Sequence, residues 1–194
     1  MGGASAALDC DSELMLWVKA GDDGSSFALL LEKHRTGVIR FLYRMVQNQA
    51  IAEELGQEVF LRVFRSRATY EPTAKFRTWL FRIATHLALN WLRDGRNERL
   101  QEPLAGDAAD GPAREISDSR PSVEQRLVYQ VRLDEVRRAV AALPDKQRAA
   151  VLMHKYEAMD YAQIARVLGC SESALKSLLF RAYETLRGRL AHLA

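Results

Sequence analysis

The sequence predicts an all-α protein in which a flexible linker joins two small helical domains. Three observations predict it: apolar residues at helical spacing, a sharp change of composition between Gly95 and Pro121, and a helix–glycine–helix pattern near the end. Alternating apolar and polar residues, typical of strands, are almost absent. With 194 residues, 48% of them hydrophobic and 27% charged, the chain is long enough to bury a core.

The first domain is expected to span residues 12–97 and to consist of helices. Apolar residues recur there every three or four positions, as on one face of a helix. Pro72 disfavours helix at Glu71, and Thr73 after it is expected to cap the last helix of the domain. The expected helices cover residues 12–19, 25–45, about 50–65 and, after the break, up to about Arg93.

The expected linker covers residues 98–121. The stretch from Gly95 to Pro121 is rich in glycine, proline, alanine and acidic residues, and it cannot bury enough apolar surface to order itself. Ser122 followed by Gln125 resembles a capping box that opens the next helix.

The second domain is expected to span residues 122–194 and to contain a helix-turn-helix. Ala165 permits close approach of two helices, and Gly169 supplies the turn between them. The expected helices cover residues 123–142, 146–156, 160–168 and 171–190. The expected core residues of the pair are Ile164, Leu168, Leu175 and Leu179.

The second helix of this pair carries polar, aromatic and cationic residues opposite its apolar face. Its N-terminal half fits a major groove, where polar side chains reach base edges and cations reach phosphates. The alternative is an ordinary helical hairpin with a solvated face. The expected DNA-contacting residues are Ser171, Glu172, Ser173, Lys176, Ser177, Phe180 and Arg181.

Composition and motifs argue against several other classes of protein. The formal charge of +3 only weakly indicates a polyanionic partner, because the distribution of charge matters more than the total. Cys10 and Cys170 form neither a disulfide framework nor a metal-ligand pattern, which suits a reducing cytoplasm. Since the chain has four scattered histidines and no glycine-rich phosphate loop, an enzyme has little support. We expect no catalytic residue, metal, cofactor or small-molecule substrate.

A cytoplasmic location without membrane insertion is also expected. The first residues lack the basic segment and apolar run of a signal peptide. No apolar stretch approaches the roughly 18–20 residues that span a bilayer.

Three segments of the second domain together resemble region 4 of bacterial sigma factors. They are Leu143–Arg148, Tyr161–Ala165 and Leu175–Ala182. The resemblance implies that this domain grips the minus-thirty-five promoter element and the flap of the RNA polymerase β subunit. The family often has threonine where Ala174 stands and arginine where Leu178 stands. Losing that arginine removes a phosphate or base contact.

The segment Ala52–Arg62 of the first domain resembles sigma region 2.2, which docks on the clamp helices of the polymerase β′ subunit. Its charged and amide side chains form a strip that offers electrostatic complementarity to a basic helical partner, while Val59 and Val63 turn inward. By itself such a strip is better explained as a solvated helix face, and only its place in the larger pattern favours docking. The expected polymerase-binding residues are Glu53, Glu54, Gln57, Glu58 and Arg62.

The segment Phe76–Arg93 resembles sigma regions 2.3 and 2.4, which recognise and help to melt the minus-ten element. Arginines there neutralise phosphates, and His86 and Asn90, one helical turn apart, can hydrogen-bond base edges. The break before this helix resembles the family's loop that captures a flipped base. For Trp79 a core or wedge-supporting role is favoured over stacking on a base. The expected minus-ten residues are Tyr70, Lys75, Phe76, Arg77, Trp79, Arg82, His86, Asn90 and Arg93.

The order of these motifs, with regions 2 and 4 alone, resembles the extracytoplasmic-function (ECF) subfamily of sigma factors. The resemblance implies a protein that binds core RNA polymerase, directs promoter-specific initiation and is controlled by an anti-sigma factor. The alternative is a stand-alone helix-turn-helix regulator, which leaves residues 53–62 and 76–93 unexplained.

Overall fold

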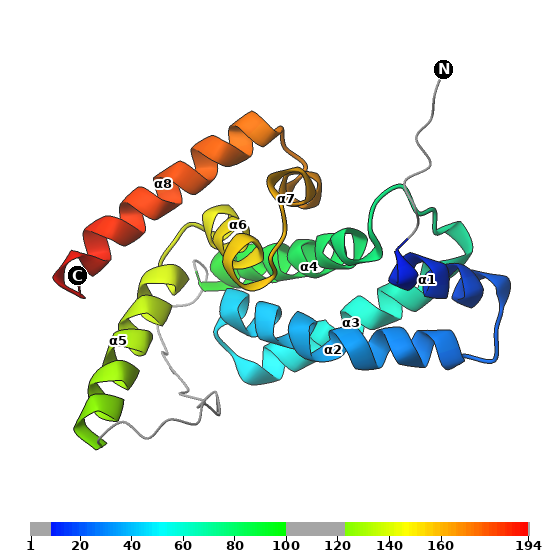
Figure 1. The fold of residues 1–194 in the computed structure, drawn as a ribbon, viewed down its shortest axis with the longest axis horizontal. Coiled ribbons are helices and arrows are strands. Elements are labelled where there is room, and N and C mark those ends of the chain that lie inside the picture. Colours follow the sequence, from blue (N-terminus) through cyan, green and yellow to red (C-terminus); the bar gives the residue numbers. More distant parts are fainter. Residues whose placement is uncertain (1–8, 100–122, 194) are drawn as a thin grey trace.

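The computed structural model describes residues 9–99 and 123–193, and within these ranges the chain is helical and contains no strand (Figure 1). The all-α class is therefore confirmed. None of the described helices is both long and apolar enough to cross a membrane. The elements are α1 (Cys10–Ala20), α2 (Ser25–Val46), α3 (Gln49–Arg65), η1 (Arg67–Thr69), α4 (Phe76–Arg99), α5 (Val123–Ala141), α6 (Asp145–Tyr156), α7 (Tyr161–Leu168), α8 (Glu172–Leu190) and η2 (Ala191–Leu193).

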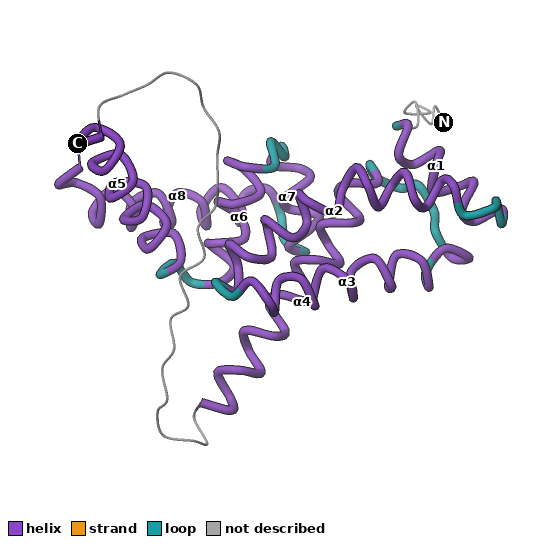
Figure 2. The backbone as a smooth tube through the Cα atoms, turned by 90° about the horizontal axis from the view of Figure 1, so that it is seen from below, coloured by secondary structure: helices purple, strands orange, loops and turns teal. Residues whose placement is uncertain are grey.

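A two-residue turn makes α2 and α3 antiparallel neighbours, which lie side by side in Figures 1 and 2. Gln47 has a left-handed φ of 56°, and its N–H donates to the carbonyl of Tyr43 at 2.8 Å, which ends α2. The side chain of Asn48 then accepts from the N–H of Ile51 at 3.1 Å and begins α3. Gly56 faces α2 so closely that a Cβ there would lie 3.0 Å from the side chain of Ile39.

The start of α4 differs from the prediction. Thr73 does not cap this helix, because α4 begins three residues later, at Phe76. The backbone N–H of Phe76 donates to the carboxylate of Asp9 and to Oγ of Ser12, both at 3.2 Å. These side chains satisfy a donor at the helix start that an ordinary cap would otherwise satisfy.

The end of α4 also differs from the prediction. The helix continues to Arg99, so residues 98 and 99 of the expected linker are helical. Gly95 weakens a helix without ending it, and the first proline after it is Pro103. The rest of the expected linker and the expected cap at Ser122 lie outside the described residues.

The helix-turn-helix predicted for the second half is confirmed. Asp160 and Gln163 form a reciprocal capping box at the start of α7. Gly169 ends α7 in the left-handed region, with a φ of 64°. Ser171 then caps α8 by accepting from the N–H of Ala174 at 3.2 Å.

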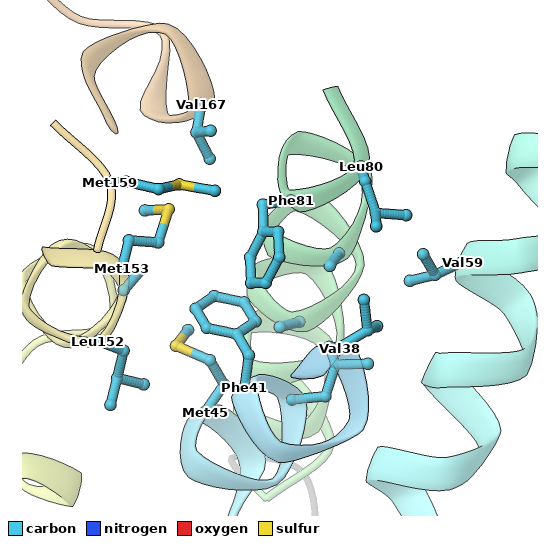
Figure 3. Close-up of a cluster of buried hydrophobic side chains, with 14 of the residues drawn as sticks. Val38, Phe41, Met45, Val59, Leu80, Phe81, Leu152, Met153, Met159 and Val167 are labelled. Atoms are coloured by element: carbon cyan, nitrogen blue, oxygen red, sulfur yellow. The ribbon is translucent and has the colours of Figure 1, made fainter. Parts of the chain in front are cut away.

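The two halves of the chain pack against each other, a contact that the sequence did not predict. The helices α6 and α7 lie against α2 and α4 (Figure 1). Figure 3 shows Phe41 of α2 and Phe81 of α4 facing Met153 of α6, Met159 of the following turn and Val167 of α7. The rings of Phe41 and Phe81 meet edge to face, with centroids 5.2 Å apart. One apolar core therefore runs through both halves.

Two arginines add polar contacts to this packing. The buried guanidinium of Arg148 on α6 donates to the carbonyl of Met45 at the end of α2, and also to the carbonyl of Leu143 at 3.2 Å. Arg44 of α2 lies over the ring of Tyr156, 4.0 Å from its centroid. Both contacts add directional constraints to an interface whose core is apolar.

Candidate functional site

The polar strip expected on α3 is exposed. Glu53, Glu54, Gln57 and Arg62 face solvent and Glu58 is half-buried, while Val59 and Val63 are buried beneath them. Two contacts lie along the strip: Nε of Arg62 donates to Glu58 at 2.7 Å, and Nε2 of Gln49 donates to Glu53 at 2.6 Å. Since the strip has three carboxylates and one cation, its net charge is negative.

The outward face of α4 brings four of the expected minus-ten residues together. Arg82, His86, Asn90 and Arg93 are all exposed and follow each other at intervals of one helical turn. Partial burial lowers the pKa of His86, and the nearby Arg82 cation lowers it further. The imidazole is therefore neutral at pH 7 and can both donate and accept a hydrogen bond. This face combines two cations with two side chains able to read base edges.

Tyr70 and Phe76 do not belong to this exposed face. Both are buried, and they form an aromatic cluster with the half-buried Trp79. The ring centroids lie 4.9 Å apart for Tyr70 and Trp79, and 5.9 Å apart for Phe76 and Trp79. Because neither buried ring is available for stacking on a base, we revise their assignment: they support the loop between them. In that loop Glu71, Thr73 and Lys75 are exposed.

Arg77 points toward the second half of the chain and does not lie on the outward face of α4. Its guanidinium forms an ion pair with Glu157 at 2.5 Å, in the turn after α6. The Glu157 side chain is only 7% exposed, whereas that of Arg77 is 40% exposed. Burial raises the pKa of Glu157, and the Arg77 cation opposes that rise. Sequence reasoning missed Glu157, because its partner lies 80 residues away.

The expected groove-reading residues lie on the exposed side of α8. Ser171, Glu172, Ser173, Lys176, Ser177, Phe180 and Arg181 are all exposed. Leu175 and Leu179 are buried on the opposite side, as expected. The hydroxyl of Ser171 is already engaged as the cap of α8. Phe180 leaves 66% of its surface exposed, which is unusual for an aromatic ring and leaves it free for a partner.

The two departures from the family pattern in α8 have different environments. Ala174 is exposed, whereas Leu178 is half-buried and packs against the core. A leucine at position 178 therefore contributes to packing within the second half.

Comparison with known proteins identifies both halves. Residues 30–98 match the family model Sigma-70 region 2, and residues 133–186 match Sigma-70, region 4. RNA polymerase sigma factor CarQ of Myxococcus xanthus is 36% identical over 171 residues, which cover 87% of this chain and 91% of CarQ. ECF RNA polymerase sigma factor BldN of Streptomyces coelicolor is 34% identical and covers 93% of this chain and 67% of BldN. The chain is a sigma factor of the ECF type.

Another relative of this sigma factor, ECF RNA polymerase sigma factor SigE of Mycolicibacterium smegmatis, is also 36% identical, but the chain spans only 60% of its length. Two solved structures share the fold. CnrH, solved with the cytosolic domain of CnrY, has a TM-score of 0.70 and 19% identity, covering 96% of this chain and all of CnrH. RpoE of Bartonella quintana, solved with the anti-sigma factor NepR, has a TM-score of 0.68 and 20% identity, covering 85% of this chain and 96% of RpoE.

Proposed function

We propose that this sigma factor attaches to core RNA polymerase through α3 and reads promoter DNA with two separate faces, one on α4 and one on α8. The observation that carries the proposal is the pair of exposed polar faces, each backed by a packed apolar core. A duplex-binding regulator needs only the face on α8. The sigma factor catalyses no reaction itself; nucleotide chemistry belongs to the polymerase, and the protein acts in the cytoplasm with it.

The α3 strip is the proposed docking site for the β′ clamp helices. Its negative charge suits a basic helical partner, and complementary charge speeds encounter and sets register. Buried Val59 and Val63 hold the strip in place from below. The proposed contact residues are Glu53, Glu54, Gln57, Glu58 and Arg62.

The outward face of α4 is the proposed minus-ten surface. Arg82 and Arg93 are placed to neutralise phosphates, and His86 and Asn90 to hydrogen-bond base edges. The exposed loop Glu71–Lys75, next to the start of α4, is the proposed receptor for an unpaired base. Trapping that base lowers the free energy of the melted state relative to the duplex.

The exposed side of α8 is the proposed minus-thirty-five surface. Lys176 and Arg181 supply charge for phosphates, and Glu172, Ser173 and Ser177 are short polar side chains able to reach base edges in a major groove. Phe180, one turn after Lys176, adds an apolar contact surface.

Binding both promoter elements at once requires the two halves to separate. The minus-ten and minus-thirty-five elements are about 25 base pairs apart, or roughly 85 Å of duplex at about 3.4 Å per base pair. In this structure α7 packs against both α4 and α8. Packed helices lie only about 8–10 Å apart, so the two DNA faces are held far too close for that spacing.

The remaining proposals concern organisation and control. The proposed domains are residues 12–99, which include all of α4, and 122–194; the proposed path of the segment between them is through the polymerase toward the active-site cleft. The β flap is the proposed second contact on polymerase. An anti-sigma factor is the proposed inhibitor, in line with the complex of RpoE and NepR.

Run-off transcription with purified core polymerase on genomic fragments tests the proposal. We expect initiation from specific start sites that disappears when Glu54 is changed to lysine, because this substitution reverses charge on the docking strip. Glu32→Lys, the same charge reversal at an exposed residue of α2, is the matched control and retains initiation. A stand-alone regulator would bind duplex DNA but would neither co-purify with core polymerase nor support initiation.

A further inference from the structure

Helix α1 holds both ends of the loop to which we assign base capture. The loop Glu71–Lys75 lies between two buried aromatic residues, Tyr70 and Phe76. Nζ of Lys19, in the last turn of α1, donates to the carbonyl of Tyr70 at 2.8 Å. Asp9 and Ser12, in the first turn region of α1, accept the backbone N–H of Phe76, both at 3.2 Å.

The anchor at the start of α1 is a small buried polar network. Ser12 is 1% exposed, and its Oγ is within 3.2 Å of both the Tyr70 hydroxyl and the Phe76 N–H. Asp9 uses one carboxylate oxygen to cap α1, at 2.6 Å from the Ser12 N–H, and the other to hold Phe76. The same carboxylate therefore sets the starts of α1 and α4 relative to each other.

A second set of contacts keeps α1 itself in place. Asp11 binds Nε2 of His34 at 2.9 Å and Nζ of Lys33 at 2.5 Å, both on α2. The His34 ring lies 5.5 Å from the ring of Phe76, so α2 also supports the end of the loop. Contacts with α2 thus hold α1 in place, and α1 in turn holds both ends of the loop.

Between its anchors the loop is short, constrained and accessible. Proline locks φ at position 72, and the N–H of Thr73 donates to the carbonyl of Glu71 at 2.8 Å. Holding a loop in its binding conformation before the ligand arrives removes the ordering cost from the binding step. The contacts with α1 therefore bear on how well the loop receives a base.

We propose that Asp9, Ser12 and Lys19 are positioning residues for promoter melting: they preset the 71–75 loop to receive an unpaired base without touching DNA themselves. This inference rests on the proposed function of the loop. It assigns a specific role to α1, which lies before the residues that match the region 2 model.

The test uses holoenzyme assembled from core polymerase and the full chain, with a promoter found by run-off transcription. The probe is a labelled single strand of its minus-ten element, intact or with one abasic site at each position in turn. Loss of affinity at one abasic site locates the captured base. The variants are Ser12→Ala and the milder Lys19→Met, with Glu13→Gln, exposed on the same helix, as the matched control.

We expect Lys19→Met, which removes one hydrogen bond, to weaken binding of the intact strand about three- to tenfold, and Ser12→Ala, which removes the bonds to Tyr70 and Phe76, to weaken it at least as much. On the strand that lacks the captured base, both variants and the parent protein bind equally. A general structural defect would instead weaken both strands alike, and that result, or intact binding by folded variants, overturns the inference. If no abasic site weakens binding by the parent protein, the proposed capture of a base by the loop is wrong. That outcome is distinct from failure of the inference about α1.

Discussion

Arg77 on α4 and Glu157 after α6 form an ion pair 2.5 Å long that joins the two halves of the sigma factor. The carboxylate is buried, while the guanidinium keeps two-fifths of its side-chain surface exposed. The two partners therefore depend on each other unequally, since breaking the pair leaves the buried carboxylate without a solvated environment, whereas the guanidinium is still in contact with water.

Replacing the two partners should have unequal consequences. Arg77→Met leaves a buried carboxylate unpaired and should lower the free energy of unfolding by about 1–3 kcal/mol, less than for a fully buried pair. Glu157→Gln leaves Arg77 able to reach water and removes a carboxylate whose pKa burial raises, so it should cost little at pH 7. Urea denaturation measures both variants, with Arg82→Met as the exposed control on the same helix. Equal losses for the two variants would contradict this account.

The stability of the protein should fall as the pH drops below about 6.5, the ordinary pKa of a histidine, because of His34. Burial lowers the pKa of His34 in the folded chain despite the nearby Asp11 carboxylate. The unfolded chain binds a proton first, so the stabilisation is complete above the pKa of the unfolded chain and is lost as the pH falls through the lower folded value. Thermal melts from pH 5 to 8 measure the slope. His34→Gln should flatten that slope, and an unchanged slope in this variant would contradict the role given to His34.

A charge placed between the halves should open the molecule. Met159 is 3% exposed and lies near Phe81 in the shared core (Figure 3). Met159→Asp buries an unpaired carboxylate there, and the least costly response is separation of the halves. Small-angle scattering should show a larger radius of gyration, with helical content by circular dichroism retained. Gln130→Asp, on the exposed side of α5, should leave the radius unchanged; an unchanged radius for Met159→Asp would mean that the interface tolerates the charge.

Two residues on the outward face of α4 should affect DNA binding in different ways. Arg82→Met should weaken holoenzyme binding across promoter sequences and reduce the slope of log affinity against log salt by about 1, because one phosphate contact is lost. His86→Ala should instead change the preference at one base position. Affinity measured over a salt series on a set of single-base promoter variants separates the two effects. Identical sequence preferences in the parent and His86→Ala would remove His86 from base reading.

Restoring the family's arginine at position 178 should destabilise this chain. Leu178 packs half-buried against the core, so Leu178→Arg should cost about 1 kcal/mol of unfolding free energy. Ala174→Thr, the other change toward the family pattern, lies on the exposed side and should stay within about 0.5 kcal/mol. Chemical denaturation compares them. A Leu178→Arg protein as stable as the parent would show that the arginine reaches solvent without disturbing the core.

Features that depend on neighbouring residues were predictable from the sequence. Helix positions follow from the local spacing of apolar residues, and the turn at Gly169 follows from the need for a left-handed φ. The exposed strips of α3 and α8 were also predictable, because their buried opposite faces determine which side is left to solvent. The start of α4 was not, because its N–H partner Asp9 lies 67 residues away along the chain.

The sequence by itself determined the helices apart from the two ends of α4, the cap at Ser171 and the faces that carry polar residues, since each of these depends on contacts within a few positions. Only the tertiary structure decided that Tyr70 and Phe76 are buried supports, that α1 anchors both ends of the loop, and that Arg77 pairs with Glu157. The physical reason is that burial and ion pairing between distant segments depend on how whole helices pack. The local pattern of one segment does not identify the distant segment against which it packs.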